Sequence, residues 1–254
     1  MQTPAPAPRP ASPADLRLQL LLVLGVSLGA SAVYSVLDLA EMVLRSSIAE
    51  SSTTLNQPLS RVPVVDALRR LAGICLALVP VALAVYLLAG TASRIPAALR
   101  GMGADGKRPA HDAAWGLGLF LAMGGGTLVL YRVGRALGIT AQITTSTLDT
   151  TWWAVALLAL TAARHALVEE VIVVAFLADR MRGLGRSWWT VAVVSSVLRA
   201  SYHLYQGVGP AVGNLVMGLV FVWCYRRYGR VMPLLLAHFL LDAAGFLAPQ
   251  LLAG

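Results

Sequence analysis

Leu167-Val-Glu-Glu-Val-Ile-Val-Val-Ala-Phe-Leu177 decides the fold, because it places two adjacent glutamates, Glu169 and Glu170, inside a long apolar run. The run begins near Trp152 and exceeds the ~20 residues that a helix needs to cross a bilayer. A carboxylate at membrane depth is costly and by default marks a functional site. The stretch therefore predicts a membrane helix that carries chemistry in its interior.

The composition of the whole chain agrees with a membrane protein. Hydrophobic residues make up 57% of the 254 residues and charged residues only 13%, whereas a soluble domain has about 25% charged residues. We therefore expect an all-α, polytopic transmembrane helical bundle with about seven spans. The net charge of +8 does not indicate nucleic-acid binding, because the basic residues are scattered among short loops instead of forming one patch.

Three parts follow one another along the chain. Residues 1–15 are rich in Pro and Ala and predict a disordered tail. Residues 16–112 predict N-terminal transmembrane helices and loops, and residues 113–254 predict a helical core that holds the polar residues. The expected spans are 18–39, 71–90, 113–131, 152–177, 188–205, a sixth that ends at Tyr225 and a seventh that begins near Val231. A helix over residues 39–50 would add an eighth span, and the run Gly124–Gly126 predicts a close contact or a local break in the third.

Loop charge predicts the orientation in the membrane. With the N-terminus in the cytoplasm, twelve Lys and Arg residues lie on the cytoplasmic side and six on the other, as the positive-inside rule requires. We expect a multi-pass protein of the cell membrane, and the Ala- and Arg-rich composition favours a bacterial inner membrane. No internal repeat is present, so a transporter built from inverted repeats has no support.

Two further polar pairs lie in later apolar runs. Arg199 and His203 belong to the fifth expected span, and His238 and Asp242 belong to the seventh. Each pair is spaced i,i+4 and so falls on one face of its helix. Three helices are thus expected to direct ionisable groups toward one interior point. Asp242 is also expected to orient the ring of His238, as a carboxylate behind a functional histidine does.

The two glutamates have different expected partners. Neighbouring residues on an α-helix point about 100° apart, so one carboxylate should face the interior and the other should reach a supporting group. His165 lies four residues before Glu169, where it could meet that carboxylate or pack against a neighbouring helix, and Arg164 beside it has the same two interpretations. The alternative without catalysis is an ion-pair network that locks the bundle.

The order Glu169-Glu170, then His203, then His238-xxx-Asp242 resembles the CPBP family of intramembrane proteases. This family includes the CAAX prenyl proteases and the bacteriocin-processing proteins of the Abi group. Its three motifs are Glu-Glu-xxx-Arg, Phe-xxx-His and His-xxx-Asn/Asp. The resemblance implies that Glu169 activates water, that Glu170 is its motif partner, and that His203, His238 and Asp242 complete the site.

The chain departs from these motifs at two positions. Val174 stands where the first motif has Arg, and Arg199 stands where the second has Phe. We hypothesise that Arg199 replaces the absent arginine as the counter-ion of Glu170. The alternative is that the changes mark a member without activity, which would act as a membrane scaffold or an immunity-type binding protein.

Two mechanisms remain open at this stage. His203, His238 and a carboxylate could hold Zn²⁺, because a catalytic zinc site needs three protein ligands and an open position, and the family is usually described as metalloproteases. The metal-free mechanism instead uses preorganised donors in a cavity of low dielectric. In either case the expected reaction is hydrolysis of a peptide bond in a membrane-bound protein or peptide substrate.

One feature of the expected geometry is inconsistent. On their helices His238 and Glu170 lie close to the cytoplasmic end, whereas His203 lies near the far end of the fifth span. For the groups to meet, the fifth helix must tilt, end early or break before His203.

Overall fold

The computed structural model describes residues 11–45, 47–145 and 152–252 of the chain. The helical elements are, in chain order, α1 (Pro13–Leu24), η1 (Gly25–Gly29), α2 (Ala30–Arg45), α3 (Pro63–Ala89), η2 (Ala92–Arg94), α4 (Ile95–Gly101), α5 (Pro109–Ala136), α6 (Trp152–Leu167), η3 (Val168–Phe176), α7 (Leu177–Gly183), α8 (Trp188–Ser201), η4 (Leu204–Gln206), α9 (Val208–Tyr228) and α10 (Met232–Leu252). Two short strands, β1 (Ser52–Leu55) and β2 (Gln142–Thr145), form a parallel pair. The predicted all-α bundle is confirmed.

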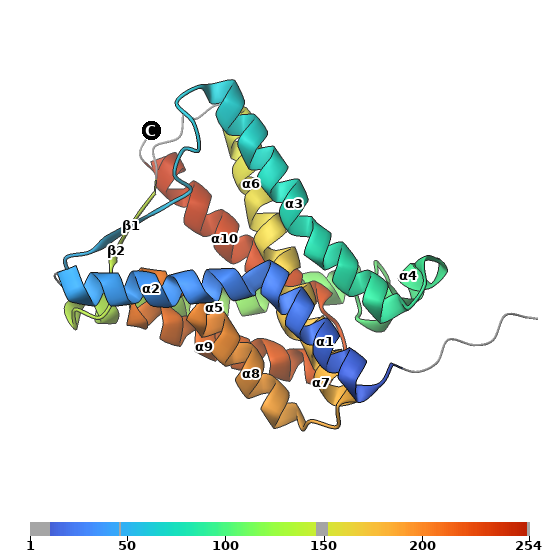
Figure 1. The fold of residues 1–254 in the computed structure, drawn as a ribbon. Helices are drawn as coiled ribbons and strands as arrows, with labels where there is room; N and C mark the ends of the chain where they lie inside the picture. Colours follow the sequence, from blue (N-terminus) through green and yellow to red (C-terminus); the bar gives the residue numbers. More distant parts are fainter. Residues whose placement is uncertain (1–10, 46, 146–151, 253–254) are drawn as a thin grey trace, which may run out of the picture.

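Each of the seven expected spans coincides with a helical segment (Figure 1). Four of the described helices are long and apolar enough to cross a membrane by themselves, namely Pro13–Arg45, Pro63–Ala89, Pro109–Ala136 and Val208–Tyr228. The chain is therefore a multi-pass membrane protein. In contrast, α8 has only 14 residues and a length of about 21 Å, which is less than the ~30 Å hydrocarbon core.

The N-terminal helix begins earlier and ends later than expected. Ser12 caps it, since the Ser12 hydroxyl accepts a hydrogen bond from the Asp15 amide and the Asp15 carboxylate accepts one from the Ser12 amide. The helix therefore starts within the predicted tail, of which residues 1–10 lie outside the described residues. It then continues through η1 and α2 to Arg45, so residues 39–45 extend the first span and form no separate eighth helix.

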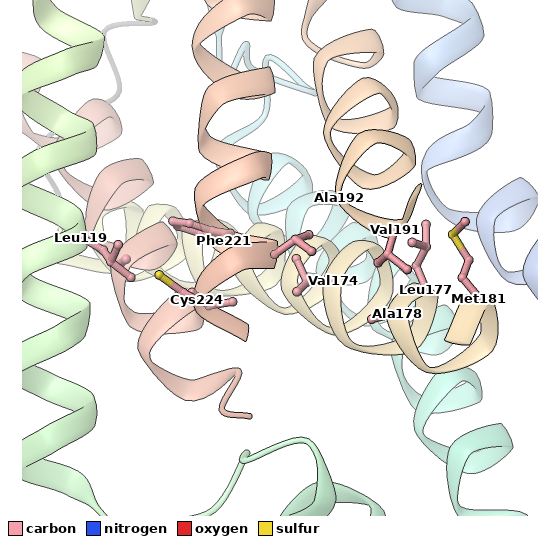
Figure 2. Close-up of a cluster of buried hydrophobic side chains, with 12 residues drawn as sticks. Leu119, Val174, Leu177, Ala178, Met181, Val191, Ala192, Phe221 and Cys224 are labelled. Carbon is pink, nitrogen blue, oxygen red and sulfur yellow. The ribbon is translucent and has the colours of Figure 1, made fainter. Parts of the chain in front are cut away.

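The core surrounds η3 and α7, which other helices pack against on several sides. Figure 2 shows Val174 and Leu177 from this segment together with Leu119 of α5, Val191 of α8 and Phe221 of α9. The α8–α9 contact is close because Gly218 of α9 has no side chain: a Cβ there would lie 2.8 Å from the Cα of Ser196. A small residue at a crossing point allows two membrane helices to approach in this way.

The local break predicted at Gly124–Gly126 is absent, because helix α5 runs through these residues without interruption. The alternative, a close contact, holds at Gly124, where a Cβ would lie 3.4 Å from Leu241 Cδ2 of α10, but not at Gly125 or Gly126, where a Cβ would meet no atom within 4 Å. The helix continues because an apolar environment requires every backbone amide and carbonyl to be bonded within the helix, and this outweighs the ~1 kcal/mol that a glycine costs relative to alanine.

The loops form one cluster at each end of the bundle. At one end Arg230, between α9 and α10, lies 2.8 Å from Asp105 and 2.6 Å from Asp112. These hydrogen bonds lower the pKa of the Asp105 carboxyl and raise the pKa of the Arg230 guanidinium. At the other end β1 pairs with β2, and Thr140 forms a bridge with Gly207. The two clusters contain the loops that the predicted topology places on opposite sides of the membrane. The strand pair and helix α4 were not predicted from the sequence.

Candidate active site

Glu169 and Glu170 lie in the first turn of η3, which is a π-helix and not an α-helix. Hydrogen bonds in a π-helix run from residue i to residue i+5, and such segments are frequent at functional sites. The wider turn rotates neighbouring side chains by less than the ~100° of an α-helix. The carboxylates therefore point closer together than expected, and both reach the same cation.

That cation is Arg199, in the last turn of α8. Its Nη2 donates a hydrogen bond to Glu170 Oε1 at 2.6 Å, and its Nη1 lies 3.1 Å from Glu169 Oε2. The Ser195 hydroxyl, one turn earlier, donates to the Val173 carbonyl at 2.8 Å and holds α8 against η3. The ion pair expected between Arg199 and Glu170 is present, and Arg199 also serves Glu169.

The two carboxylates differ in their exposure and in their other partners. The Glu169 side chain is 9% exposed and that of Glu170 is fully buried. The buried Tyr202 hydroxyl donates a hydrogen bond to Glu169 Oε2 at 2.7 Å. Glu170 Oε1 lies 2.6 Å from His238 Nδ1, while its Oε2 is buried with no hydrogen-bond partner. Glu169 is thus the carboxylate that a reactant can approach.

His238 is held differently from the expectation. Its Nδ1 bonds to Glu170, whereas its Nε2 lies 3.8 Å from Asp242 Oδ1, which is beyond hydrogen-bond distance. Asp242 Oδ2 instead bonds to Nδ1 of His165 at 2.9 Å. The i,i+4 spacing did place Asp242 beside His238, but the ring of His238 is turned toward the glutamates. Glu170, not Asp242, therefore orients His238.

His165 follows the second of its two expected arrangements. It faces the neighbouring helix α10, where its ring contacts Phe246 and its Nδ1 bonds to Asp242. Its Nε2 is hydrogen-bonded to Nη2 of Arg164. Arg164, His165 and Asp242 thus form a second polar group that adjoins the glutamates through His238.

The end of α8 bears on the inconsistency in depth. Helix α8 ends at Ser201, which is the early end that the geometry requires, and His203 lies two residues past it and is half-buried. Its Nδ1 donates to the Arg199 carbonyl at 2.9 Å, which leaves Nε2 as the available nitrogen. Within the described part of the chain no ion pair joins His203 to a carboxylate. Its ring centroid lies 4.9 Å from that of Tyr202, so it stands beside the site without touching the glutamates.

The zinc site considered from the sequence can be tested against the arrangement of these residues. Among the described residues, the group that could hold an ion is Glu169, Glu170 and His238, whose ligand atoms lie within 4.8 Å of one another; His203 is outside this group. However, Arg199 already brings a positive charge to both carboxylates, and His238 Nδ1 is engaged by Glu170. Glu170 Oε2 and His238 Nε2 keep free lone pairs, so ligand atoms are present, but the guanidinium of Arg199 competes with a divalent metal for both carboxylates.

Residues 151–244 match the family model described as Type II CAAX prenyl endopeptidase Rce1-like. The match supports the CPBP family of intramembrane proteases for this part of the chain. The match covers all of the residues that the sequence singles out in η3, α8 and α10, and it supports a protease activity in general. Searches of curated proteins and of solved structures gave no match.

Sequence reasoning missed one residue of this candidate site. Tyr202 precedes His203, and a tyrosine near the end of an apolar run ordinarily marks the membrane–water interface. Only the early end of α8 brings the Tyr202 hydroxyl to Glu169. The spacing offered one weak signal, because residues 199, 202 and 203 fall on one helical face.

Proposed function

We propose that the chain is an intramembrane endopeptidase in which Glu169 activates the water that attacks a peptide bond. The single observation that supports this best is the position of Glu169. It is the less buried of two adjacent carboxylates, and it receives hydrogen-bond or ionic support from Tyr202 and Arg199. A positioned carboxylate that takes a proton from water contributes about 10²–10⁴ to a hydrolysis rate.

The neighbouring residues have distinct proposed roles. Arg199 compensates the charge of both glutamates, and Glu170 holds His238 through Nδ1. The Nε2 atoms of His238 and His203 remain available to donate, when protonated, to the oxygen that becomes negative as water adds to the carbonyl. Asp242 of α10 bonds to His165 of α6 and so holds these two helices together beside the glutamates. Proton transfer from Glu169 to the leaving nitrogen then completes the hydrolysis.

We propose that this reaction proceeds without a metal. The positive charge that zinc would supply to the carboxylates is supplied here by the guanidinium of Arg199. Metal analysis of the purified protein, combined with cleavage assays before and after dialysis against a chelator, tests this point. Loss of cleavage on chelation and its recovery with Zn²⁺ would contradict it.

The site is proposed to lie near the cytoplasmic side of a bacterial inner membrane, with the N-terminus in the cytoplasm. The excess of basic residues in the loops on that side supports this orientation. His238 follows Val231 by seven residues, which places it about 10 Å into the membrane. The substrate class is a membrane-bound protein or peptide.

Comparison of Glu169→Ala with the wild-type protein tests the proposed function. Each protein is reconstituted in liposomes with a detergent extract of bacterial membrane proteins, and new N-termini are counted by mass spectrometry. The wild type should generate N-termini that are absent with Glu169→Ala. Glu41→Ala is the matched control, because that glutamate is exposed on α2 and should leave cleavage unchanged. Identical products from wild type and Glu169→Ala would contradict the proposal.

The second candidate is a membrane scaffold without catalysis. It is favoured by one observation, the arginine that occupies both carboxylates. In that case wild type and Glu169→Ala should both leave the extract uncut, while only the variant loses thermal stability.

A further inference from the structure

A cavity of about 400 Å³ lies between α3, α6 and the segment after β1, outside the group around Glu169. Three of the residues that line it are arginines: Arg69, Arg70 and Arg164. Arg70 is paired with Asp66 at 2.6 Å, and Arg69 donates to the Leu59 carbonyl at 2.6 Å. Two of the three cations are therefore used to fix the loop before α3.

Arg164 has no such partner. It lies in the apolar run of α6 and donates through Nη2 to the neighbouring His165, while its Nε is buried without a hydrogen-bond partner. Of the carboxylates in the described residues, none lies within ion-pair distance of its guanidinium. Glu169 and Asp242 are near enough to act on Arg164 electrostatically but do not pair with it directly, and a cation at membrane depth is costly unless an interior or a cavity supplies a direct partner. The cavity is where an anion can reach it.

This cavity is linked to the candidate active site by consecutive polar contacts. Arg164 bonds to His165, His165 bonds to Asp242 at 2.9 Å, and Asp242 lies 3.8 Å from His238. His238 in turn bonds to Glu170 at 2.6 Å. His165 and Asp242 therefore separate a molecule bound at Arg164 from His238, and Arg164 lies five residues before Glu169 on the same helical segment.

We propose that this cavity binds a carboxylate of the peptide substrate, with Arg164 as its counter-ion. The identification of the ligand as a peptide rests on the proposed function. A guanidinium presents a planar pair of donors that matches a carboxylate, and the volume is in the range of sites for small molecules and short peptide segments. The carboxylate can come from the end of a chain or from an acidic side chain.

Binding of short peptides to the full-length protein tests the proposal independently of cleavage. The Glu169→Gln protein, in nanodiscs of uncharged lipid, is titrated with acetyl-trileucine as the free acid and as the amide. Acetyl-Leu-Leu-Asp-amide and acetyl-Leu-Leu-Asn-amide then distinguish an acidic side chain from a chain end. Dissociation constants are compared between this protein and versions that also carry Arg164→Gln, Arg164→Lys or, as a control at an exposed site, Arg45→Gln.

At least one carboxylate peptide should bind about tenfold or more tightly than its uncharged counterpart, since a hydrogen bond to a charged group contributes about that factor. Arg164→Gln should abolish the preference, Arg164→Lys should keep part of it, and Arg45→Gln should retain it. Equal binding of charged and uncharged peptides, or no binding of either, overturns the proposal even if Arg164→Gln does not fold.

The two proposals can fail separately. A carboxylate preference that depends on Arg164, in a protein whose wild type cleaves nothing, refutes the endopeptidase and keeps the cavity assignment. Cleavage by the wild type together with no carboxylate preference refutes the cavity assignment alone. A preference that persists in Arg164→Gln also refutes it, because another cation would then bind the peptide.

Discussion

Replacement of Arg199 by leucine removes the cation that both glutamates share. The Arg199 side chain is 0% exposed, and its guanidinium lies 2.6 Å from Glu170 Oε1 and 3.1 Å from Glu169 Oε2. Removal of one partner from a buried ion pair costs about 3–5 kcal/mol, because the other charge stays buried and uncompensated. In a protein of this size each kcal/mol lowers Tm by about 2–4 °C, so we expect a decrease in Tm of about 6–20 °C.

Thermal unfolding of the purified protein in detergent measures this effect. Arg45→Leu is the control, because Arg45 forms an exposed ion pair with Glu41 and such pairs contribute about 1 kcal/mol or less. Adding Glu170→Gln to Arg199→Leu removes one uncompensated charge. The double variant should therefore recover at least about 1 kcal/mol relative to Arg199→Leu alone.

The family motif suggests a second way to restore the pair. Position 174 lies one turn after Glu170. It is the position at which the first CPBP motif has its arginine. The double variant Val174→Arg/Arg199→Phe should have a higher Tm than Arg199→Phe alone, because the new arginine restores a cation on the helical segment that carries the glutamates. A Tm of Arg199→Leu within 2 °C of wild type, or no recovery with either second change, would refute the view that Arg199 is the counter-ion of these glutamates.

Three other predictions test separate parts of the molecule. Tyr202→Phe removes the 2.7 Å hydrogen bond to Glu169 and should slow cleavage about 10–100-fold in the assay of new N-termini; an unchanged rate would exclude this support. The lowered pKa of the Asp105 carboxyl stabilises the folded protein above pH ~4 and is lost below it, so between pH 5 and pH 3 the Tm of wild type should fall more than that of Asp105→Asn. Gly218→Ala should cost about 1–3 kcal/mol in thermal unfolding because its Cβ meets the backbone of Ser196, whereas Gly126→Ala, with open space, should not destabilise.

The helices were predictable because a bilayer imposes one strong constraint. A run of about 20 apolar residues must form a helix in the membrane, and the expected runs do so except the fifth, whose helix ends at Ser201. The ends were less predictable, because they depend on local signals and on packing. The Ser12–Asp15 capping box could have been found in the sequence. The pairing of β1 with β2 could not, because it joins two loops that are 90 residues apart.

The site residues were predictable to the extent that helical periodicity determines their direction. Spacing placed His238 and Asp242 on one face of α10, and they do lie near each other. Spacing could not predict that the ring of His238 bonds to Glu170, or that Asp242 bonds to His165 of α6. Both hydrogen bonds depend on partners that other helices supply. The π-helical turn of η3, which brings both glutamates to Arg199, has no counterpart in the hydrophobic pattern.

The two departures from the family motifs are best understood as one change. A buried pair of carboxylates needs a cation nearby, because two uncompensated charges at this depth cost more than the folding free energy of a typical domain can tolerate. At position 174 that cation is missing and a fully buried valine packs into the core. At position 199 a fully buried arginine appears, on a different helix but directed at the same oxygens. Charge compensation at the glutamates is therefore preserved although neither position follows the motif.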